Sequence, residues 1–392
     1  MGGGLMQLVA YGAQDIYLTG NPQITFFKVV YRRHTNFAME AIEQTWNGGE
    51  VGPAAGRCTA TISRNGDLVN RMYLEVDCAG MDQTPVNPMA AGITDIEIEI
   101  GGQKIDKQSG QWMNVWAHLT EPNPSAQVGT TTADGVAVGC TPYQQATGMG
   151  GILAANNAQT FYVPLQFWFC RNPGLALPLI ALQYHEVKVI LEHNWALVDQ
   201  AAVTSNKLWC DYIYLDTDER RRFAQVSHEY LIEQVQVQST TAGAGSSDLT
   251  FNHPVKELIW CVKSTIGLVA TTGAAAGAVG ARGTYQLKLN GHDRFAARDF
   301  RYFSRAQVLA YHTGPGGLTA VADKAGNMCD GIGVYSFCLK PEEHQPSGTC
   351  NFSRIDNAQF VCTTGCTADR VFAVNYNVLR IMSGMGGLAY SN

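Results

Sequence analysis

Two segments of the chain repeat one pattern, in which an alternating strand runs into a glycine-containing turn. Residues Ile96–Ile100 place isoleucines on one face and glutamates on the other, and Gly101–Gly102 supplies a turn. Tyr285–Leu289 alternates in the same way and ends at Asn290–Gly291, a pair that tolerates positive φ and favours tight hairpins. A period of two is typical of half-buried strands, so we predict a chain rich in β-hairpins.

The two halves of the chain share further features in the same order. A proline-containing stretch leads into strand-like sequence at Pro178–Val189 and at Pro346–Asn357, and a tyrosine-bearing strand closes each half, at Asp211–Leu215 and Asn375–Leu379. Matched features in one order indicate an internal duplication with loops of unequal length. Short strands and long loops in two successive units favour two β-sandwiches, and two jelly rolls are the simplest such architecture.

The boundary between the two units is expected at the mixed-charge segment 216–225, which we interpret as a solvated linker. We predict an N-terminal arm over residues 1–25 and a first jelly roll over 26–218. The first strand is expected at Phe26–Tyr31. The second jelly roll, with a C-terminal tail, is expected over 219–392.

One helix is predicted to interrupt the first unit. Ser109 is a suitable N-cap, and apolar side chains follow it at the i, i+3, i+4 and i+7 spacing of one helix face: Trp112, Val115, Trp116 and Leu119. We interpret this aromatic stripe as core packing rather than as a ligand site.

Composition excludes several classes of function. Charged residues make up 15% of the chain and the formal net charge is −6, so the dense Lys and Arg that phosphate binding needs are missing and direct nucleic-acid binding is not expected. So low a charged fraction also fits a surface that partner chains partly cover. No segment approaches the ~20 apolar residues of a transmembrane helix. Eleven cysteines, an odd number, favour reduced buried thiols over a disulfide framework.

No catalytic constellation is recognisable in the sequence. The His-Glu pairs at 185–186 and 228–229 lack a second histidine at metalloprotease spacing, and the first of these histidines is interpreted as structural. No nucleophile elbow or phosphate-binding loop occurs. Cys350, Cys362 and Cys366 lack the paired C-x-x-C spacing of structural zinc sites. We therefore predict a protein that is not an enzyme and has no catalytic, metal-binding or cofactor-binding residues.

Several long segments have distinctive sequences that strand periodicity alone does not explain. They lie at 8–28, 31–38, 62–68, 173–187, 346–357 and 375–390. These segments, among them LVAYGAQDIYLTGNPQITFFK near the start and NYNVLRIMSGMGGLAY near the end, closely resemble the major capsid proteins of nucleocytoplasmic large DNA viruses, especially the chlorella-virus type. The resemblance extends from one end of the chain to the other.

The resemblance implies an all-β chain of two consecutive eight-stranded jelly rolls with long loops and a few short helices. It also implies that three chains form a pseudo-hexagonal capsomer, because three copies with two similar domains present six similar edges. The implied partners are other copies of the chain, in the trimer and in the lattice between trimers, and minor capsid and penton proteins. The implied location is an icosahedral virion assembled in the host cytoplasm, whose shell can overlie an internal viral membrane.

Assembly residues are expected near both ends of the chain. We interpret the apolar N-terminal segment as an arm that lies beneath the domains or reaches a neighbouring protein; the alternative is a strand of the chain's own core. The candidate assembly residues are Leu8, Tyr11, Asp15, Tyr17, Asn21, Arg380, Met382 and Met385. Asn351 begins an Asn-Phe-Ser sequon and is a candidate glycosylation site.

Two other functions remain open at this point. One is a minor capsid or penton-type protein built on a related jelly roll. The other, from a different class, is a carbohydrate-binding β-sandwich, which would need a pocket where aromatic side chains and carboxylates converge.

Overall fold

The protein is described by a computed structural model that divides into two compact units, Met1–Asn36 and Phe37–Asn392, hereafter the arm and the main unit. The described residues are 6, 8–10, 12–52, 54–78, 88–121, 128–131, 137–140, 142–149, 159–198, 203–240, 243, 245–261, 283–314, 316, 318–320, 328–363, 366, 368 and 370–390.

The described residues of the arm are helical at 6, 8 and 9 and in the helical turn α2 (Ile16–Thr19), and they form no strand. The strand expected at Phe26–Tyr31 is wrong, because these residues form no strand and the first strand is β1 (Phe37–Gln44). Phe26 is 92% exposed and Phe27 is 98% exposed. Their apolar side chains satisfy the sequence pattern of a strand, but the described residues of the arm contain no other strand with which they could pair.

The first jelly roll consists of two facing antiparallel sheets. One has the order β1, β12 (Val203–Leu215), β4 (Leu68–Cys78) and β10 (Leu177–Pro178), with β9 (Gln159–Pro164) also paired to β4. The other has the order β2 (Trp46–Gly48), β3 (Ala55–Thr61), β11 (Val187–Asn194), β5 (Ile93–Ile100) and β6 (Gln103–Ser109). The predicted alternation in β5 is confirmed, because Ile96, Ile98 and Ile100 are all fully buried.

The second jelly roll repeats this arrangement. Its first sheet has the order β13 (His228–Ser239), β23 (Arg370–Met382), β15 (Pro254–Cys261) and β20 (Ile332–Ser336), with β21 (Cys350–Asn351) paired to β15 and β24 (Met385–Leu388) paired to β23. Its second sheet has the order β14 (Gly245–Leu249), β22 (Ala358–Cys362), β16 (Thr284–Leu289) and β17 (His292–Asp299). The expected fold class, two consecutive jelly rolls, is confirmed.

The remaining elements are short. They are the hairpins β7 (Val128–Thr131) with β8 (Ala137–Cys140) and β18 (Leu318–Ala320) with β19 (Met328–Asp330), and the helices α3 (Pro88–Gly92), α4 (Gly110–Thr120), α5 (Pro142–Thr147), α6 (Trp168–Arg171), α7 (Thr217–Gln225), η3 (Tyr302–Gln307), α8 (Val308–Tyr311) and the 3-10 turns η1 (Pro173–Leu175), η2 (Trp195–Leu197) and η4 (Phe352–Arg354).

The predicted helix is α4. The Ser109 hydroxyl accepts a hydrogen bond from the Trp112 backbone N–H at 3.1 Å, which satisfies one of the free donors of the first turn. Trp112 and Trp116 are buried, so the aromatic stripe is core, as predicted.

The segment 216–225 is exposed, as expected of a solvated segment, but it is the helix α7 rather than an irregular linker. The Asp216 carboxylate accepts from the Thr217 N–H at 2.8 Å, and Arg220 pairs with Asp67 of the first jelly roll at 3.0 Å. The charged residues that we interpreted as part of a linker therefore cap this helix, through Asp216, and pair it with the first jelly roll, through Arg220.

The duplication extends to the connection after the hairpin in each half. In the first half β5, a glycine turn, β6 and the helix α4 follow one another; in the second half β16, a turn, β17 and the helical segment η3–α8 do the same. The turn residues Gly101 and Gly102 have φ of 59° and 83°, and Asn290 and Gly291 have 49° and 79°, so both turns use the left-handed region that their residues tolerate.

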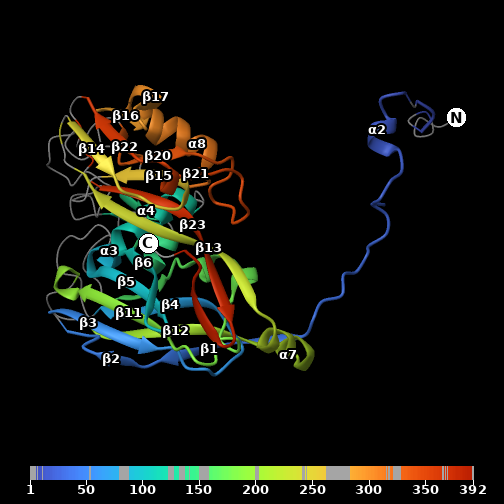
Figure 1. Ribbon diagram of the computed structural model, residues 1–392, viewed down its shortest axis with the longest axis horizontal. Coiled ribbons are helices and arrows are strands. Elements are labelled where there is room, and N and C mark those ends of the chain that lie inside the picture. The colour runs from blue at the N-terminus through green and yellow to red at the C-terminus, as the bar shows by residue number, and fades with distance from the viewer. Residues whose placement is uncertain are drawn as a thin grey trace. The chain divides into compact units, whose positions relative to one another are not determined.

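The two jelly rolls share a continuous core. Figure 1 shows the first jelly roll at the lower end of the main unit, the second at the upper end, and α4 between them. The Trp112 ring of α4 lies 5.2 Å from the Phe372 ring of β23, and one cluster of buried apolar side chains includes residues of both halves. The outer face of the β13–β23–β15 sheet is therefore an internal surface of the protein.

The cysteines depart from expectation at one pair. Cys362 and Cys366 form a disulfide with their Cα atoms 6.1 Å apart, whereas an all-thiol chain was expected. In the part of the chain that the structure describes, Cys58, Cys170, Cys210, Cys338 and Cys350 are free, and three of these five, Cys58, Cys210 and Cys338, are buried.

Candidate assembly surfaces

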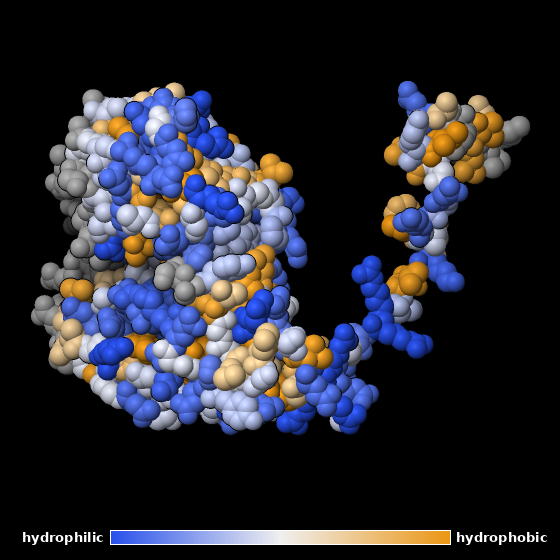
Figure 2. Space-filling model, viewed as in Figure 1, coloured by the Kyte–Doolittle hydropathy of each residue, from blue (hydrophilic) through white to orange (hydrophobic). Residues whose placement is uncertain are grey.

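The arm carries its apolar side chains on its surface. Leu8 is 78% exposed and Tyr17 is 92% exposed, and Figure 2 shows hydrophobic side chains over much of the arm. Tyr11, the third apolar candidate of this segment, lies outside the described residues. An exposed cluster of large apolar groups is typical of a surface that binds a partner.

The polar candidates of the arm shape its backbone. The Asp15 carboxylate accepts a hydrogen bond from the Gly12 N–H at 2.7 Å, just before α2. Asn21 follows α2 with φ of 52°, a left-handed conformation that asparagine tolerates better than most residues. Both residues therefore help to define the ends of the helical turn.

The C-terminal candidates lie on the hairpin of β23 and β24. Arg380 pairs with Glu229 of β13 at 2.8 Å, and both side chains are well exposed. Met382 and Met385 flank the turn and are 48% and 52% exposed. The hairpin thus presents two flexible apolar side chains, which adapt readily to a partner surface.

This hairpin also contacts the first jelly roll. The Tyr184 N–H donates to the Gly384 carbonyl at 3.0 Å, and the Gly386 N–H lies 3.1 Å from Nδ1 of His185. His185 is thus held by backbone groups of this hairpin, and its interpretation as structural stays a prediction. Gly384 has φ of 80° and a Cβ there would meet the Tyr184 ring at 2.6 Å, so this turn requires glycine.

Asn351 is exposed at the end of β21. Its side-chain carbonyl accepts a hydrogen bond from the Ser353 N–H at 3.0 Å and caps the turn η4. The residue is on the surface, and its glycosylation stays a prediction.

A buried cluster of charged groups joins the two jelly rolls, and sequence reasoning missed it. Glu233 of β13 is 5% exposed, and its carboxylate lies 3.0 Å from Arg171 of α6 and 2.8 Å from Lys256 of β15. His344 lies 3.5 Å from the same carboxylate. Lys256 is 1% exposed and also donates to the Glu343 carbonyl at 3.0 Å. The sequence signal was a charge inside an apolar stretch of a strand, as in the YLIEQV of β13.

The cations around Glu233 set its ionisation. Burial alone raises the pKa of a carboxyl group, but Arg171, His344 and Lys256 together lower the pKa of Glu233 to about 2. The guanidinium of Arg171 also stacks over the Trp116 ring, 4.9 Å from its centroid. Ion pairing and stacking thus fix α6 of the first jelly roll against β13 of the second.

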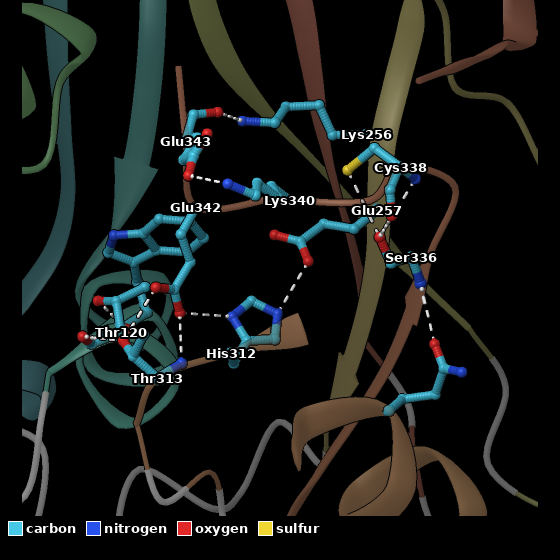
Figure 3. A network of polar contacts seen from close by, with 12 residues as sticks. Thr120, Lys256, Glu257, His312, Thr313, Ser336, Cys338, Lys340, Glu342 and Glu343 are labelled. Carbon is cyan, nitrogen blue, oxygen red and sulfur yellow. Dashed lines mark hydrogen bonds and ion pairs between the residues drawn. The ribbon is translucent and has the colours of Figure 1, made fainter. Parts of the chain in front are cut away.

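A second buried pair lies close to α4. Figure 3 shows His312 between two carboxylates, with Nε2 at 3.0 Å from Glu257 and Nδ1 at 3.1 Å from Glu342. The side chains of His312 and Glu257 are fully buried. Burial lowers the pKa of His312, but the two carboxylates outweigh it and raise the pKa to about 9. His312 is therefore a cation that neutralises Glu257 inside the junction.

The Glu342 carboxylate extends this network to the first jelly roll. It accepts hydrogen bonds from the backbone N–H and the hydroxyl of Thr313, at 2.8 and 2.9 Å. The Thr313 hydroxyl lies 2.9 Å from the Thr120 carbonyl at the end of α4. These polar contacts fix the junction in one geometry.

A cavity of about 560 Å³ opens at the rim of this junction. Its lining residues include Arg71, Tyr73, Trp116, Arg171 and Glu342. Nε and Nη2 of Arg171 have no hydrogen-bond partner among the residues of the described ranges. No three His, Cys, Asp or Glu side chains in those ranges are grouped so that they could hold a metal ion, and no described helix is long and apolar enough to cross a membrane.

Comparisons with known proteins agree with this architecture. A family model described as "Major capsid protein N-terminus" matches residues 25–216, and one described as "Large eukaryotic DNA virus major capsid protein" matches residues 219–387. The chain is 52% identical to the major capsid protein of Pyramimonas orientalis virus and 41% identical to that of Paramecium bursaria Chlorella virus 1, each match covering 100% of both chains.

A solved structure gives the same result. The chain resembles the subunit in a quasi-atomic model of the PBCV-1 virus capsid with a TM-score of 0.77 and 36% identity, over 94% of this chain and 100% of the other. The relatives named above are major rather than minor capsid proteins. The chain belongs to the major capsid proteins of large eukaryotic DNA viruses, and it is a structural component of the virion that associates with itself in the capsid.

Proposed function

We propose that this chain forms a homotrimer that acts as a pseudo-hexagonal capsomer, and that these capsomers tile an icosahedral shell. The observation that carries the proposal is the repeated strand order of the two jelly rolls, which are fixed together by the buried junction. A rigid chain with two similar domains supplies two of six similar edges, so three copies complete a six-sided block.

Light scattering of the full-length recombinant chain tests the trimer. The expected particle has three times the 42.5 kDa mass of one chain and persists on dilution. A monomer at every accessible concentration would overturn the proposal. No catalytic role is proposed.

As domain boundaries we propose an N-terminal segment over residues 1–25, which is the greater part of the arm, a first jelly roll over 26–218 and a second jelly roll with its tail over 219–392. Deletion of 1–25 tests the first boundary, since the remaining chain is expected to keep its melting temperature and its trimeric mass. A large loss of stability would assign the deleted residues to the core instead.

The exposed arm and the β23–β24 hairpin are the proposed contacts beyond the trimer. Large apolar side chains at Leu8 and Tyr17, and flexible ones at Met382 and Met385, suit binding to minor capsid and penton proteins and to neighbouring trimers. The capsomers are proposed to assemble in the host cytoplasm, with a shell that can overlie an internal membrane.

Tyr17→Asp together with Leu8→Asp tests the arm. The variant is expected to form trimers of normal stability, while the yield of particles or flat arrays falls. Unchanged particle yield would remove the arm from the assembly contacts.

A further inference from the structure

One short part of the arm combines large apolar side chains with positive charge. Residues 24–33 read ITFFKVVYRR, and three of these ten residues are cations while none is acidic. The formal charge of this stretch is therefore +3, whereas the whole chain carries −6. We call residues 24–33 the basic segment, and the assembly candidates Leu8 and Tyr17 lie outside it. Its six large apolar members are Ile24, Phe26, Phe27, Val29, Val30 and Tyr31.

The apolar side chains of the basic segment are strongly exposed. Each of the six is at least 73% exposed, and Phe27 reaches 98%. Figure 2 shows hydrophobic and hydrophilic residues next to one another along the arm. Monomeric proteins rarely leave so many neighbouring large apolar groups in water, so this segment is expected to bind a partner.

The arm supplies only one carboxylate against these three cations. Asp15 is its single acidic residue, and that carboxylate accepts a hydrogen bond from the Gly12 N–H at 2.7 Å. Lys28, Arg32 and Arg33 are all exposed. Clustered basic residues of this kind are attracted to an anionic surface.

The order of the side chains favours a lipid surface over a protein partner. A strand that joins a partner's sheet commonly has one apolar and one polar face, because successive side chains point in opposite directions. In an extended chain Phe26 and Val30 point to one side. Phe27, Val29 and Tyr31 point to the other, so both faces of the basic segment carry large apolar groups.

A strand covered by protein on both faces leaves no place for a cation in its middle, yet Lys28 lies there. The interface of a bilayer has no such restriction. It accepts apolar and aromatic side chains around a bound segment while the cations remain among the headgroups.

We propose that the basic segment binds an anionic lipid surface. Its aromatic and aliphatic side chains enter the headgroup region, and Lys28, Arg32 and Arg33 lie beside the negative groups of the lipids. The attachment is peripheral. The inference rests on the proposed function only for where the chain meets such a surface, and the binding itself is testable without it.

Co-sedimentation of the full chain with vesicles tests this inference. The wild type is expected to bind vesicles in which about a third of the lipid is phosphatidylserine about 100-fold more tightly than vesicles of phosphatidylcholine alone. Raising the ionic strength from about 0.1 M to about 1 M should remove most of this preference, because the Debye length falls from about 10 Å to about 3 Å.

Two double variants separate the charge from the apolar groups. Arg32→Gln with Arg33→Gln is expected to weaken binding to the anionic vesicles about 30-fold, since each basic residue near an anionic surface contributes about fivefold. Phe26→Ser with Phe27→Ser is expected to weaken binding to both kinds of vesicle, because it removes apolar area.

A matched control removes the same charge elsewhere. Arg57→Gln with Lys188→Gln lies on β3 and β11 of the main unit, where each side chain pairs with a glutamate. This variant should bind vesicles as the wild type does. The melting temperature of each variant shows whether its main unit is still folded.

Every outcome decides the inference independently of the trimer. A wild type that binds neither kind of vesicle overturns it, and so does equal binding to both that Arg32→Gln with Arg33→Gln leaves unchanged. If these two substitutions reduce particle yield without any vesicle binding, the segment binds protein instead. Light scattering of the same preparations reports the trimer: a monomer that binds anionic vesicles defeats the trimer alone, and a trimer that does not bind them defeats this inference alone.

Discussion

Glu233 of β13 and Arg171 of α6 form an ion pair at 3.0 Å across the junction of the two jelly rolls, and both side chains are largely removed from water. The pair joins segments from different halves of the chain. Because Lys256 binds the other carboxylate oxygen, loss of Glu233 leaves two buried cations without their anion.

Glu233→Gln is therefore expected to destabilise the protein strongly. The free energy of unfolding should fall by about 3 kcal/mol or more, since removing one partner of a buried pair leaves the other charge uncompensated. Urea denaturation measures the change. Glu229→Gln on the same strand is the matched control, because it breaks only the exposed pair with Arg380 and should change stability by less than about 1 kcal/mol. Equal effects of the two substitutions would contradict the role of the cluster.

The same carboxylate makes stability depend on acid pH. The folded-state pKa of Glu233 is lowered to about 2, below its ordinary value of 4.5, so its contribution is fully present above pH 4.5 and is lost as the pH falls through 2. Stability measured from pH 5 down to pH 2 should decline more steeply in the wild type than in Glu233→Gln. If the stability of the two proteins falls equally over this range, other carboxylates cause the loss of stability at acid pH.

Because His312 is buried between two carboxylates, we expect a second loss of stability at alkaline pH. Its folded-state pKa is raised to about 9 by Glu257 and Glu342, so its contribution is complete below the ordinary value of 6.5 and is lost as the pH rises through 9. Stability should fall between pH 6.5 and 9 by on the order of 3 kcal/mol. His312→Gln should be less stable at pH 6 and nearly flat over this range, whereas substitution of the exposed His292 should leave the profile unchanged. A wild type with no alkaline decline would rule out a charged His312.

Trp112→Ala tests whether the two jelly rolls unfold as one. Removal of the fully buried ring beside Phe372 should lower the free energy of unfolding by about 3 to 5 kcal/mol. It should also split one calorimetric transition into two, because the shared core couples the halves. A single unsplit transition at lower temperature would mean that the polar cluster alone maintains the coupling, and Trp112→Phe provides the smaller change for comparison.

The Cys362–Cys366 disulfide predicts sensitivity to reductant. Closing so short a loop stabilises by about 2 kcal/mol in the chain-entropy description, so dithiothreitol should lower the melting temperature of the wild type. The Cys362→Ser and Cys366→Ser double variant should melt at the lower temperature with and without reductant. If reductant shifts both proteins equally, it acts elsewhere in the chain.

The sequence predicted those elements whose signals are local. Alternation and a glycine turn defined β5 and β16, and a capping serine with an aromatic stripe defined α4. The strand expected at Phe26–Tyr31 was wrong because a strand needs a neighbouring strand, which no local pattern reveals. The segment 216–225 is a helix with Asp216 as its N-cap. We interpreted its many charged residues as a linker and so did not recognise this capping residue.

The buried cluster was beyond local reasoning for a related reason. Glu233, Arg171 and Lys256 come from three separate elements, and only the fold brings them within ion-pair distance. The apolar candidates Leu8 and Tyr17 are on the surface of the arm, and Met382 and Met385 are on an exposed turn. Their place in assembly stays a prediction.

The repeat of one strand order in two covalently joined but different jelly rolls has an evolutionary consequence. A shell built from one domain type must accept every mutation at all six corners of a hexagonal position simultaneously. In the trimer proposed above, a substitution in one jelly roll alters only alternate corners, so loops on the second can diversify while the first keeps its contacts unchanged. In a protein with two jelly rolls, one domain can therefore keep its assembly contacts while the other domain, at the alternate corners of the capsomer, accepts sequence changes.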